Sequence, residues 1–536
     1  MTTEAIDTLK TGYTFDGATL ELGVALDGET PVPDVPISIP LSMLNRHGLV
    51  AGATGTGKTV TLQVLAEQLS RAGVPVFASD IKGDLSGIGA PGVASEKLTK
   101  RLDAAGQKWD PKANPTEFYT LGDSGLGTPI RATVTSFGPI LLSKVLELND
   151  TQESVLSLVF HYADKAGLAL LDLSDLQAVL TYLTSAEGKA ELEGIGGASK
   201  ATVGVILRKI AELSAQGGDV FFGEPEFDTA DLLRVDDSGA GIVSVLELQK
   251  LSQSPALFST FLMWLLADLF QDLPEVGDAD KPALVFFFDE AHLLFADASK
   301  AFLESVTQTV RLIRSKGVGV FFVTQTPKDV PEDVLAQLGS RIQHQLRAHT
   351  PNDAKALKAT VQTFPKSGYD LEELLTSLGI GEAIVTVMDP DGAPTPVAPT
   401  RMRAPESKIG PMSEDEVRAA VAASPQQKKY GTAIDNESAR EILTARLEAG
   451  AAEKDAEAKA GQQPTDSASS GPAGAGSRGA EKVPFPSDPA PTRTKQAPKE
   501  DNLFSQVVNS SAFKQFTRTA AREIARGIFG TSRRRR

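Results

Sequence analysis

Short apolar runs alternate along the chain with longer stretches in which apolar residues recur every three or four positions. The runs predict buried β-strands, and the wider spacing predicts amphipathic helices. A repeated order of strand and helix is typical of a parallel sheet with helices on its faces. The predicted strands are residues 48–51, 74–80, 241–248, 283–288, 319–324, 342–347 and 381–388, and the predicted helices are residues 60–71, 255–273, 300–316 and 331–338. The fold class is therefore predicted to be α/β with a mainly parallel sheet, closed by a hairpin at the Asp-Pro-Asp-Gly turn of residues 389–392.

Changes in this pattern divide the chain into segments. Residues 12–40 carry short strand and turn signals, whereas the Leu- and Ala-rich region after residue 133 predicts helices at 152–166, 174–184 and 199–215. Residues 455–501 are rich in Ala, Gly, Pro, Ser and charge, which is typical of a disordered linker. The expected segments are a small N-terminal β segment (1–40), the first part of the α/β core (41–132), an inserted helical domain (133–235), the second part of the core (236–412), a polar helical extension (413–454), the linker (455–501) and a C-terminal helix (502–536).

The C-terminal segment is predicted to be a basic amphipathic helix. Its apolar residues fall three or four apart, while Lys514, Arg518, Arg522 and Arg526 follow one another at intervals of four. Such a helix can bind anionic lipid, nucleic acid or a groove on a partner protein. It can equally dock its apolar face on the protein's own body, so its partner stays open.

Composition narrows the chemistry. The 536 residues include no cysteine and only five histidines, which excludes disulfides and thiolate zinc sites and leaves oxygen-bound Mg²⁺ as the expected metal. The formal net charge of −16 argues against a surface that coats nucleic acid throughout, although a local basic stripe or a pore lining is compatible with it. Neither a membrane-spanning window nor a signal-peptide pattern is recognised, so a cytoplasmic location is expected.

A glycine-rich run directly after the first core strand fits the pattern G-x-x-x-x-G-K-[ST]. In this pattern the backbone N–H groups surround phosphate oxygens, Lys58 reaches the β- and γ-phosphates, and the Thr59 hydroxyl can ligate Mg²⁺. The helix that follows adds the positive end of its dipole. The predicted ATP-binding residues are Gly52, Ala53, Thr54, Gly55, Thr56, Gly57, Lys58 and Thr59.

Two acids end the apolar strand 283–288. Behind a phosphate-binding loop, Asp289 is placed to accept from the hydration shell of Mg²⁺, and Glu290 to polarise the attacking water as general base. A polar cluster of Asp80, Lys82 and Asp84 ends the strand 74–80, at the edge where α/β folds collect ligand groups.

Other polar residues are expected around the phosphates. Gln325, after the strand 319–324, is predicted to sense the γ-phosphate or its water. Because the glycine-rich run holds no arginine, one is expected from elsewhere, commonly from a neighbouring subunit, to neutralise the developing charge. The candidates are Arg311, Arg314, Arg341 and Arg347.

Taken in order, these motifs resemble the HerA/FtsK superfamily of ATPases and, within it, the bacterial HerA-like proteins. The resemblance is carried by residues 52–59, the Asp-Ile-Lys-Gly-Asp-Leu run of 80–85, the Asp-Glu-Ala-His run of 289–292, and residues 314–319, 323–327 and 340–347. It implies an additional-strand, catalytic-glutamate fold that assembles as a ring, commonly a hexamer, with ATP at subunit interfaces. It also implies that Arg314 acts in trans, with Arg341 as second choice.

Two functions are compatible with this reading. The first is a ring-forming ATPase motor that translocates or remodels double-stranded DNA. The alternative is an ATP-dependent regulatory or remodelling protein whose partner is another protein or the membrane surface, reached through the basic C-terminal helix.

Overall fold

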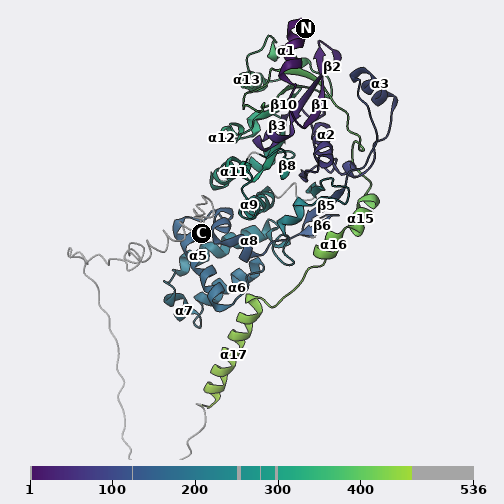
Figure 1. Ribbon diagram of the computed structural model, residues 1–536. Helices are drawn as coiled ribbons and strands as arrows, with labels where there is room; N and C mark the ends of the chain where they lie inside the picture. The colour runs from purple at the N-terminus through teal and green to yellow at the C-terminus, as the bar shows by residue number, and fades with distance from the viewer. Residues whose placement is uncertain (1–2, 123–124, 250–254, 278, 296–299, 461–536) are drawn as a thin grey trace, which may run out of the picture. The chain divides into compact units, whose positions relative to one another are not determined.

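A single mixed sheet organises the computed structural model, which describes residues 3–122, 125–249, 255–277, 279–295 and 300–460 (Figure 1). Its strands in chain order are β1 (Thr19–Asp27), β2 (Thr30–Pro40), β3 (Gly48–Ala51), β4 (Val76–Asp80), β5 (Thr116–Leu121), β6 (Thr128–Ile130), β7 (Val243–Glu247), β8 (Leu284–Phe288), β9 (Val318–Thr324), β10 (Ser340–His344), β11 (Glu382–Thr386) and β12 (Ala398–Met402). In space they follow the order β2-β1-β12-β11-β10-β3-β9-β8-β4-β7-β5-β6.

The strands from β10 to β6 in this order all pair in parallel, whereas β11, β12, β1 and β2 pair with their neighbours antiparallel. The prediction of an α/β fold with a mainly parallel sheet is confirmed. The predicted closing hairpin corresponds to β11 and β12, with the turn closed by a bond from the Gly392 N–H to the Asp389 carbonyl (2.9 Å). Sequence patterns did not reveal β5 and β6, and they placed β10 about two residues late.

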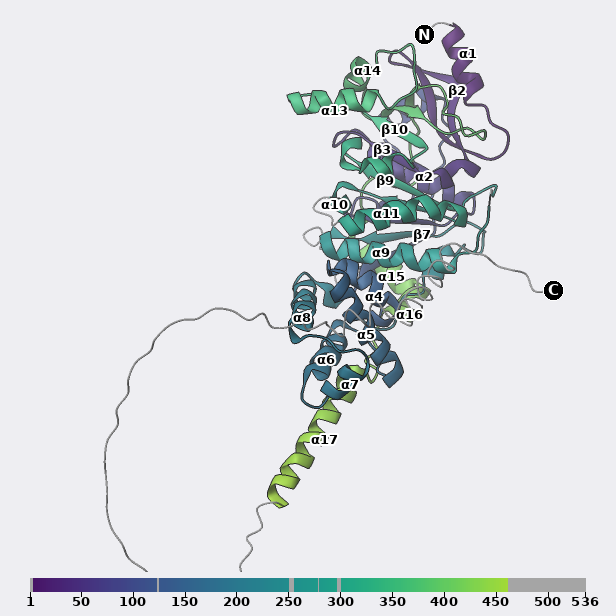
Figure 2. The same cartoon turned by 90° about the vertical axis from the view of Figure 1, so that its left-hand side faces the viewer.

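Helices cover both faces of the sheet, and others pack beyond its edge. The helices in chain order are α1 (Thr3–Gly12), α2 (Lys58–Arg71), α3 (Glu96–Ala105), α4 (Val134–Val145), α5 (Asp150–Ala166), α6 (Leu173–Thr184), α7 (Lys189–Gly194), α8 (Lys200–Ala215), α9 (Pro255–Asp272), α10 (His292–Phe295), α11 (Lys300–Ile313), α12 (Glu332–Leu335), α13 (Pro351–Val361), α14 (Leu371–Ser377), α15 (Glu414–Ala423), α16 (Pro425–Tyr430) and α17 (Ala439–Ala460). In Figure 2, α9 and α11 cross the face of the sheet that is turned toward the viewer.

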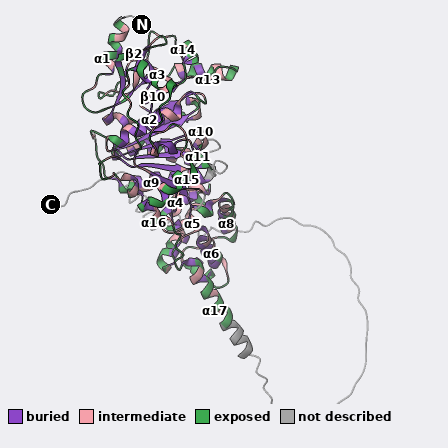
Figure 3. Cartoon of the chain, turned by 90° about the vertical axis from the view of Figure 1, so that its right-hand side faces the viewer, coloured by how far each residue is buried: buried purple, intermediate pink, exposed green. Residues whose placement is uncertain are grey.

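The alternation of side chains along β8 explains this two-sided cover. Phe286 and Phe288 point into a core shared with α9 and α11, while Val285 and Phe287 point into a second core shared with α2. All five residues of β8 are buried, and Figure 3 shows the strands of the sheet as largely buried. A strand buried on both faces has a continuous run of apolar residues, so the sequence pattern predicts β8 clearly.

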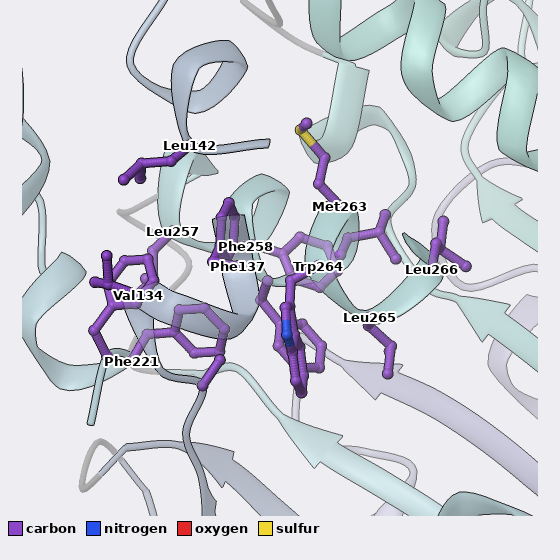
Figure 4. Close-up of a cluster of buried hydrophobic side chains, with 14 of the residues drawn as sticks. Val134, Phe137, Leu142, Phe221, Leu257, Phe258, Met263, Trp264, Leu265 and Leu266 are labelled. Carbon is purple, nitrogen blue, oxygen red and sulfur yellow. The ribbon is translucent and has the colours of Figure 1, made fainter. Parts of the chain in front are cut away.

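The Leu- and Ala-rich region folds as helices α4 to α8. Helix α5 begins at a capping box in which the Asn149 side chain accepts from the Gln152 N–H, so a local signal sets its start. Figure 4 shows how α4 and α9 share one apolar cluster, in which the Phe221 ring meets Trp264 edge to face with centroids 5.8 Å apart. These helices belong to the same compact unit as the sheet, residues 1–449. The division of that unit into separate domains stays a prediction.

A second unit spans residues 450–536, of which the structure describes only the end of α17. Because α17 runs to Ala460, helix extends into the start of the predicted linker 455–501. The rest of that linker and the predicted basic helix 502–536 lie outside the described residues. Within the described part of the chain, no helix combines the length and apolarity needed to cross a bilayer.

His47, between the short helix η1 (Leu41–Arg46) and β3, joins the start of β9 to the end of α11. Its Nδ1 accepts a hydrogen bond from the Val320 N–H (3.1 Å), so the proton is on Nε2, which donates to the Val310 carbonyl (2.7 Å). Burial lowers the pKa of His47 to about 4, because a charged ring would lose its hydration.

We expect this buried histidine to make folding stability depend on pH. Between the folded pKa of about 4 and the ordinary value of 6.5, the unfolded chain binds a proton that the folded chain does not, so the free energy of unfolding falls as pH falls. A shift of this size is worth about 3 kcal/mol. The measurement is denaturant unfolding of the wild type and of His47→Gln over this pH range. The free energy of unfolding of the wild type, relative to that of the variant, should fall by this amount as pH falls. A difference that stays constant with pH would contradict the assignment.

Candidate functional site

The glycine-rich loop joins β3 to α2 at the carboxyl edge of the parallel sheet. Gly57, the residue before α2, has φ of 115°, and a Cβ added to it would come within 3.2 Å of the Gly381 Cα. A Cβ on Gly52 would come within 2.5 Å of the His344 Cβ. The loop can therefore close so tightly only because glycine stands at these two positions.

Neighbouring strands hold the loop from both sides. The Gly52 N–H donates to the Thr324 carbonyl at the end of β9 (3.2 Å), and the Ala53 N–H donates to the Gln345 carbonyl just after β10 (2.8 Å). These are the strands that pair with β3, so the sheet itself fixes the loop. The start of the loop is thus set before any ligand binds.

His344, the last residue of β10, supports the loop and the first turn of α2. One ring nitrogen, Nε2, lies 3.0 Å from the Thr61 hydroxyl, and the other, Nδ1, lies 2.9 Å from the Glu382 carbonyl. Burial lowers the pKa of His344 to about 4. The ring is therefore a neutral structural link and not a proton donor to substrate near neutral pH.

Lys58 turns its ammonium group back into the loop. Its Nζ donates to the carbonyls of Gly52 (2.7 Å) and Ala53 (3.2 Å), and the side chain is buried. Burial lowers the pKa of Lys58, as does the nearby charge of Lys82, while the carboxylate of Glu290 raises it. A buried cation in a glycine-rich loop at the N-terminus of a helix fits the triphosphate of a nucleotide.

Asp289 and Glu290 follow β8, which is separated from β3 in the sheet by β9 alone. Asp289 is buried, and its Oδ1 accepts from the Glu290 N–H (2.9 Å). Burial raises the pKa of Asp289 to about 7 against the lowering effect of Lys82. A positive charge brought beside it, such as Mg²⁺, would favour the ionised carboxylate.

Glu290 has an unusual backbone for a residue with a side chain, with φ of 47°. Its Oε1 forms an ion pair with the Lys82 ammonium. Its Oε2 lies 3.1 Å from the His292 Nδ1, without hydrogen-bond geometry, and is buried with no hydrogen-bond partner among the described residues. Burial raises the pKa of Glu290, but the bond and charge of Lys82 outweigh it and hold the pKa below its ordinary value. Glu290 is thus an ionised carboxylate with one acceptor oxygen left for a further donor.

Lys82, which the sequence placed in the polar cluster after β4 without a role, forms an ion pair with Glu290. Asp80 of that cluster is used locally: it accepts from the N–H groups of Gly83 (2.6 Å) and Leu85 (2.9 Å) and so shapes the turn. Burial raises the pKa of Asp80 to about 6. The sequence could not reveal this contact because it does not give the order of strands in the sheet, and the pairing of β4 with β8 is what brings Lys82 to Glu290.

The predicted sensor lies at the same edge of the sheet. Gln325 directly follows β9, and the Gln325 side chain is exposed. Thr324, the last residue of β9, is opposite Ala51 of β3. The Thr324 hydroxyl, in contrast, donates to Asp329 (2.7 Å) and serves the turn. The role of Gln325 as a sensor stays a prediction.

The candidate arginines are not brought together. Arg314, at the start of the short helix η6 (Arg314–Lys316), precedes β9 and so lies at the amino edge of the sheet, opposite the loop.

The other three candidates differ in their contacts. Arg341 is within β10, and its Nη1 lies 3.5 Å from the Thr363 carbonyl. Burial lowers the pKa of Arg341. Arg347 is the candidate that contacts the loop, through its Nη2 and the Thr54 carbonyl (3.4 Å). Arg311, on α11, is exposed.

The donor set suits a Mg²⁺ ion that retains water and phosphate ligands. Within the described ranges, no group of three or more His, Asp or Glu side chains could hold a metal alone. The predicted ligands, Thr59 and Asp289, supply one hydroxyl and one carboxylate, which matches the few protein ligands that Mg²⁺ uses beside a nucleotide.

Comparisons of sequence and fold reveal similarity to known proteins. The model of the family described as "Helicase HerA-like C-terminal" matches residues 28–536. The DNA double-strand break repair helicase HerA of Sulfurisphaera tokodaii is 25% identical over 66% of this chain and 64% of its own length. The HerA helicase of Saccharolobus solfataricus is 24% identical over 70% of this chain and 67% of its own length. Among solved structures, the bacterial conjugative coupling protein TrwBdeltaN70 is similar with a TM-score of 0.49 and 16% identity, over 75% of this chain and 92% of that chain.

Proposed function

The chain belongs to the helicase HerA-like C-terminal family, and from this membership and the geometry of the site we propose that it is an ATP-hydrolysing motor. The observation that carries the proposal is one juxtaposition. The fold brings Lys58 in its glycine-rich loop and the acids Asp289 and Glu290 to one edge of the sheet. The strands that precede them, β3 and β8, are separated in the sheet by β9 alone.

Each residue then has a definite task. The loop amides and Lys58 would bind the phosphates, while Thr59 and Asp289 would hold the metal ion. ATP with its Mg²⁺, when bound, supplies the γ-phosphoryl group and the charge that neutralises its oxygens. The Glu290 carboxylate orients the attacking water and accepts its proton, and Gln325 contacts the same water or the γ-phosphate.

We further propose that the motor is a ring oligomer, a hexamer as the resemblance implies, and that its substrate is double-stranded DNA. The relatives of matching sequence are described as DNA double-strand break repair helicases, and this chain spans 64% of the length of the first of them. The position of Arg314 supports an assembly, since it lies at the opposite edge of the sheet from its own phosphate loop.

Duplex DNA is expected to raise the rate of ATP hydrolysis, and the stimulation should fall steeply with salt. Binding of a DNA backbone releases condensed counterions, so the apparent affinity for DNA drops with added salt. The measurement is the ATPase rate with and without duplex DNA over a salt series, paired with a mass measurement of the ATP-bound assembly. Hydrolysis indifferent to DNA at every salt concentration would favour a protein or membrane-surface partner instead. A monomeric mass with ATP would contradict the ring.

A further inference from the structure

We propose that Lys82 is a positioning residue for Glu290, whose ammonium group fixes one carboxylate oxygen and leaves the other to accept from the attacking water. The inference rests on the proposed ATP hydrolysis and adds to it the residue that orients the general base. It comes from the ion pair of Lys82 with the Glu290 Oε1, together with the buried and unpartnered Oε2 of the same carboxylate.

The turn that carries Lys82 is built to hold it in place. Strand β4 pairs in parallel with β8, with Ser79 opposite Phe288, so the residues after the two strands emerge side by side. Asp80 closes the turn with two backbone hydrogen bonds. Gly83 has φ of 76°, and a Cβ on it would overlap the Gln249 side chain at 1.2 Å. Lys82 therefore extends from a turn whose conformation is fixed on both sides.

Glu290 needs such a partner because its other contacts do not fix its carboxylate. The left-handed backbone sets where the side chain starts but not where its oxygens point. The His292 Nδ1 is close to Oε2 without the geometry of a hydrogen bond. Among the described residues, the ion pair with Lys82 is the contact that fixes Oε1.

Removal of Lys82 would leave the Oε1 of the buried Glu290 carboxylate without the contact that fixes it. An uncompensated buried charge is costly, so the carboxylate would turn toward another donor, such as the His292 Nδ1 that lies 3.1 Å from Oε2. Glu290 would then no longer present a free oxygen to the water.

The test compares Lys82→Met and Lys82→Arg in the wild-type and Glu290→Gln backgrounds of the full chain. Lys82→Met is expected to lower kcat about tenfold or more with KM changed less than about threefold, because the loss concerns orientation and not nucleotide binding. Lys82→Arg, which keeps a cation at this position, should recover most of the rate. In the Glu290→Gln background, Lys82→Met should change both the single-turnover rate and the affinity for ATPγS, measured by calorimetry, by less than about twofold.

The control is Lys100→Met, which removes an exposed lysine paired with Glu96 on α3 (2.6 Å) and should leave rate, binding and thermal midpoint unchanged. Equal losses from Lys82→Met in both backgrounds, or weaker ATPγS binding, would overturn the inference, because Lys82 would then act on the nucleotide directly. An unchanged kcat in Lys82→Met would also overturn it. Failure of the proposed function would look different: the wild type would lack turnover, or Glu290→Gln would hydrolyse ATP at the wild-type rate.

Discussion

Replacement of Glu290 by glutamine is expected to lower kcat for ATP hydrolysis by about 10²–10⁴-fold while ATP remains bound. Glutamine keeps the size of the side chain and can still contact the water, but its amide cannot accept the proton. The Lys58 ammonium is held by the carbonyls of Gly52 and Ala53 and not by this side chain, so the affinity for ATP should be close to that of the wild type. Rapid-quench turnover and equilibrium binding of ATP, measured on the same preparation, give the two quantities separately.

The matched control for this substitution is Glu304→Gln. Glu304 is an exposed glutamate on α11 whose Oε1 lies 3.6 Å from the Lys300 ammonium, and neither residue is among the predicted ligands. It should hydrolyse ATP like the wild type, because an exposed ion pair contributes little. If Glu290→Gln turned over at the rate of Glu304→Gln, the assignment of Glu290 as general base would be wrong.

The fold could be predicted in outline because its central strands are buried on both faces. Residues 284–288 form an apolar run that no exposed strand would show, and the neighbouring runs of β4, β7 and β9 are similar. Strand β6 is only three residues long, and β5 begins with Thr-Glu, so neither gives such a run. The place of β5 in the sheet depends on pairing with β7, which is a long-range contact that the local pattern does not contain, and β6 then pairs with β5.

The candidate site was predictable where one segment carries the chemistry, as in residues 52–59 and the Asp289-Glu290 pair. Lys82 shows the limit. Its segment was predicted to be a polar strand end, but the contact with Glu290 arises from strand order. In sequence, 203 residues and three further strands lie between β4 and β8. The arginines show the same limit, because sequence proximity to a motif does not reveal at which edge of the sheet a side chain lies.

Replacement of Arg314 by alanine is expected to lower kcat by about 10³-fold or more, through loss of charge stabilisation at a site in the neighbouring subunit. Arg314 precedes β9, and a strand of seven residues spans about 20 Å, so in its own chain the guanidinium is remote from the loop at the other end of the strand. Binding of ATP should persist in the variant, because the loop and Lys58 are untouched.

Mixed assemblies distinguish action in trans from local damage. When Arg314→Ala chains are mixed with Glu290→Gln chains, each inactive alone, activity should appear, because a Glu290→Gln chain still supplies its Arg314 to the intact Glu290 site of an Arg314→Ala neighbour. Arg418→Ala, which removes an exposed arginine paired with Glu414 on α15 (3.2 Å), is the matched control and should hydrolyse ATP like the wild type without any partner variant. Mixtures that stay inactive would show that Arg314 serves the site of its own chain and would remove it as the trans-acting residue. The same mixing experiment with Arg341→Ala then tests the second candidate, whose side chain reaches toward the Thr363 carbonyl.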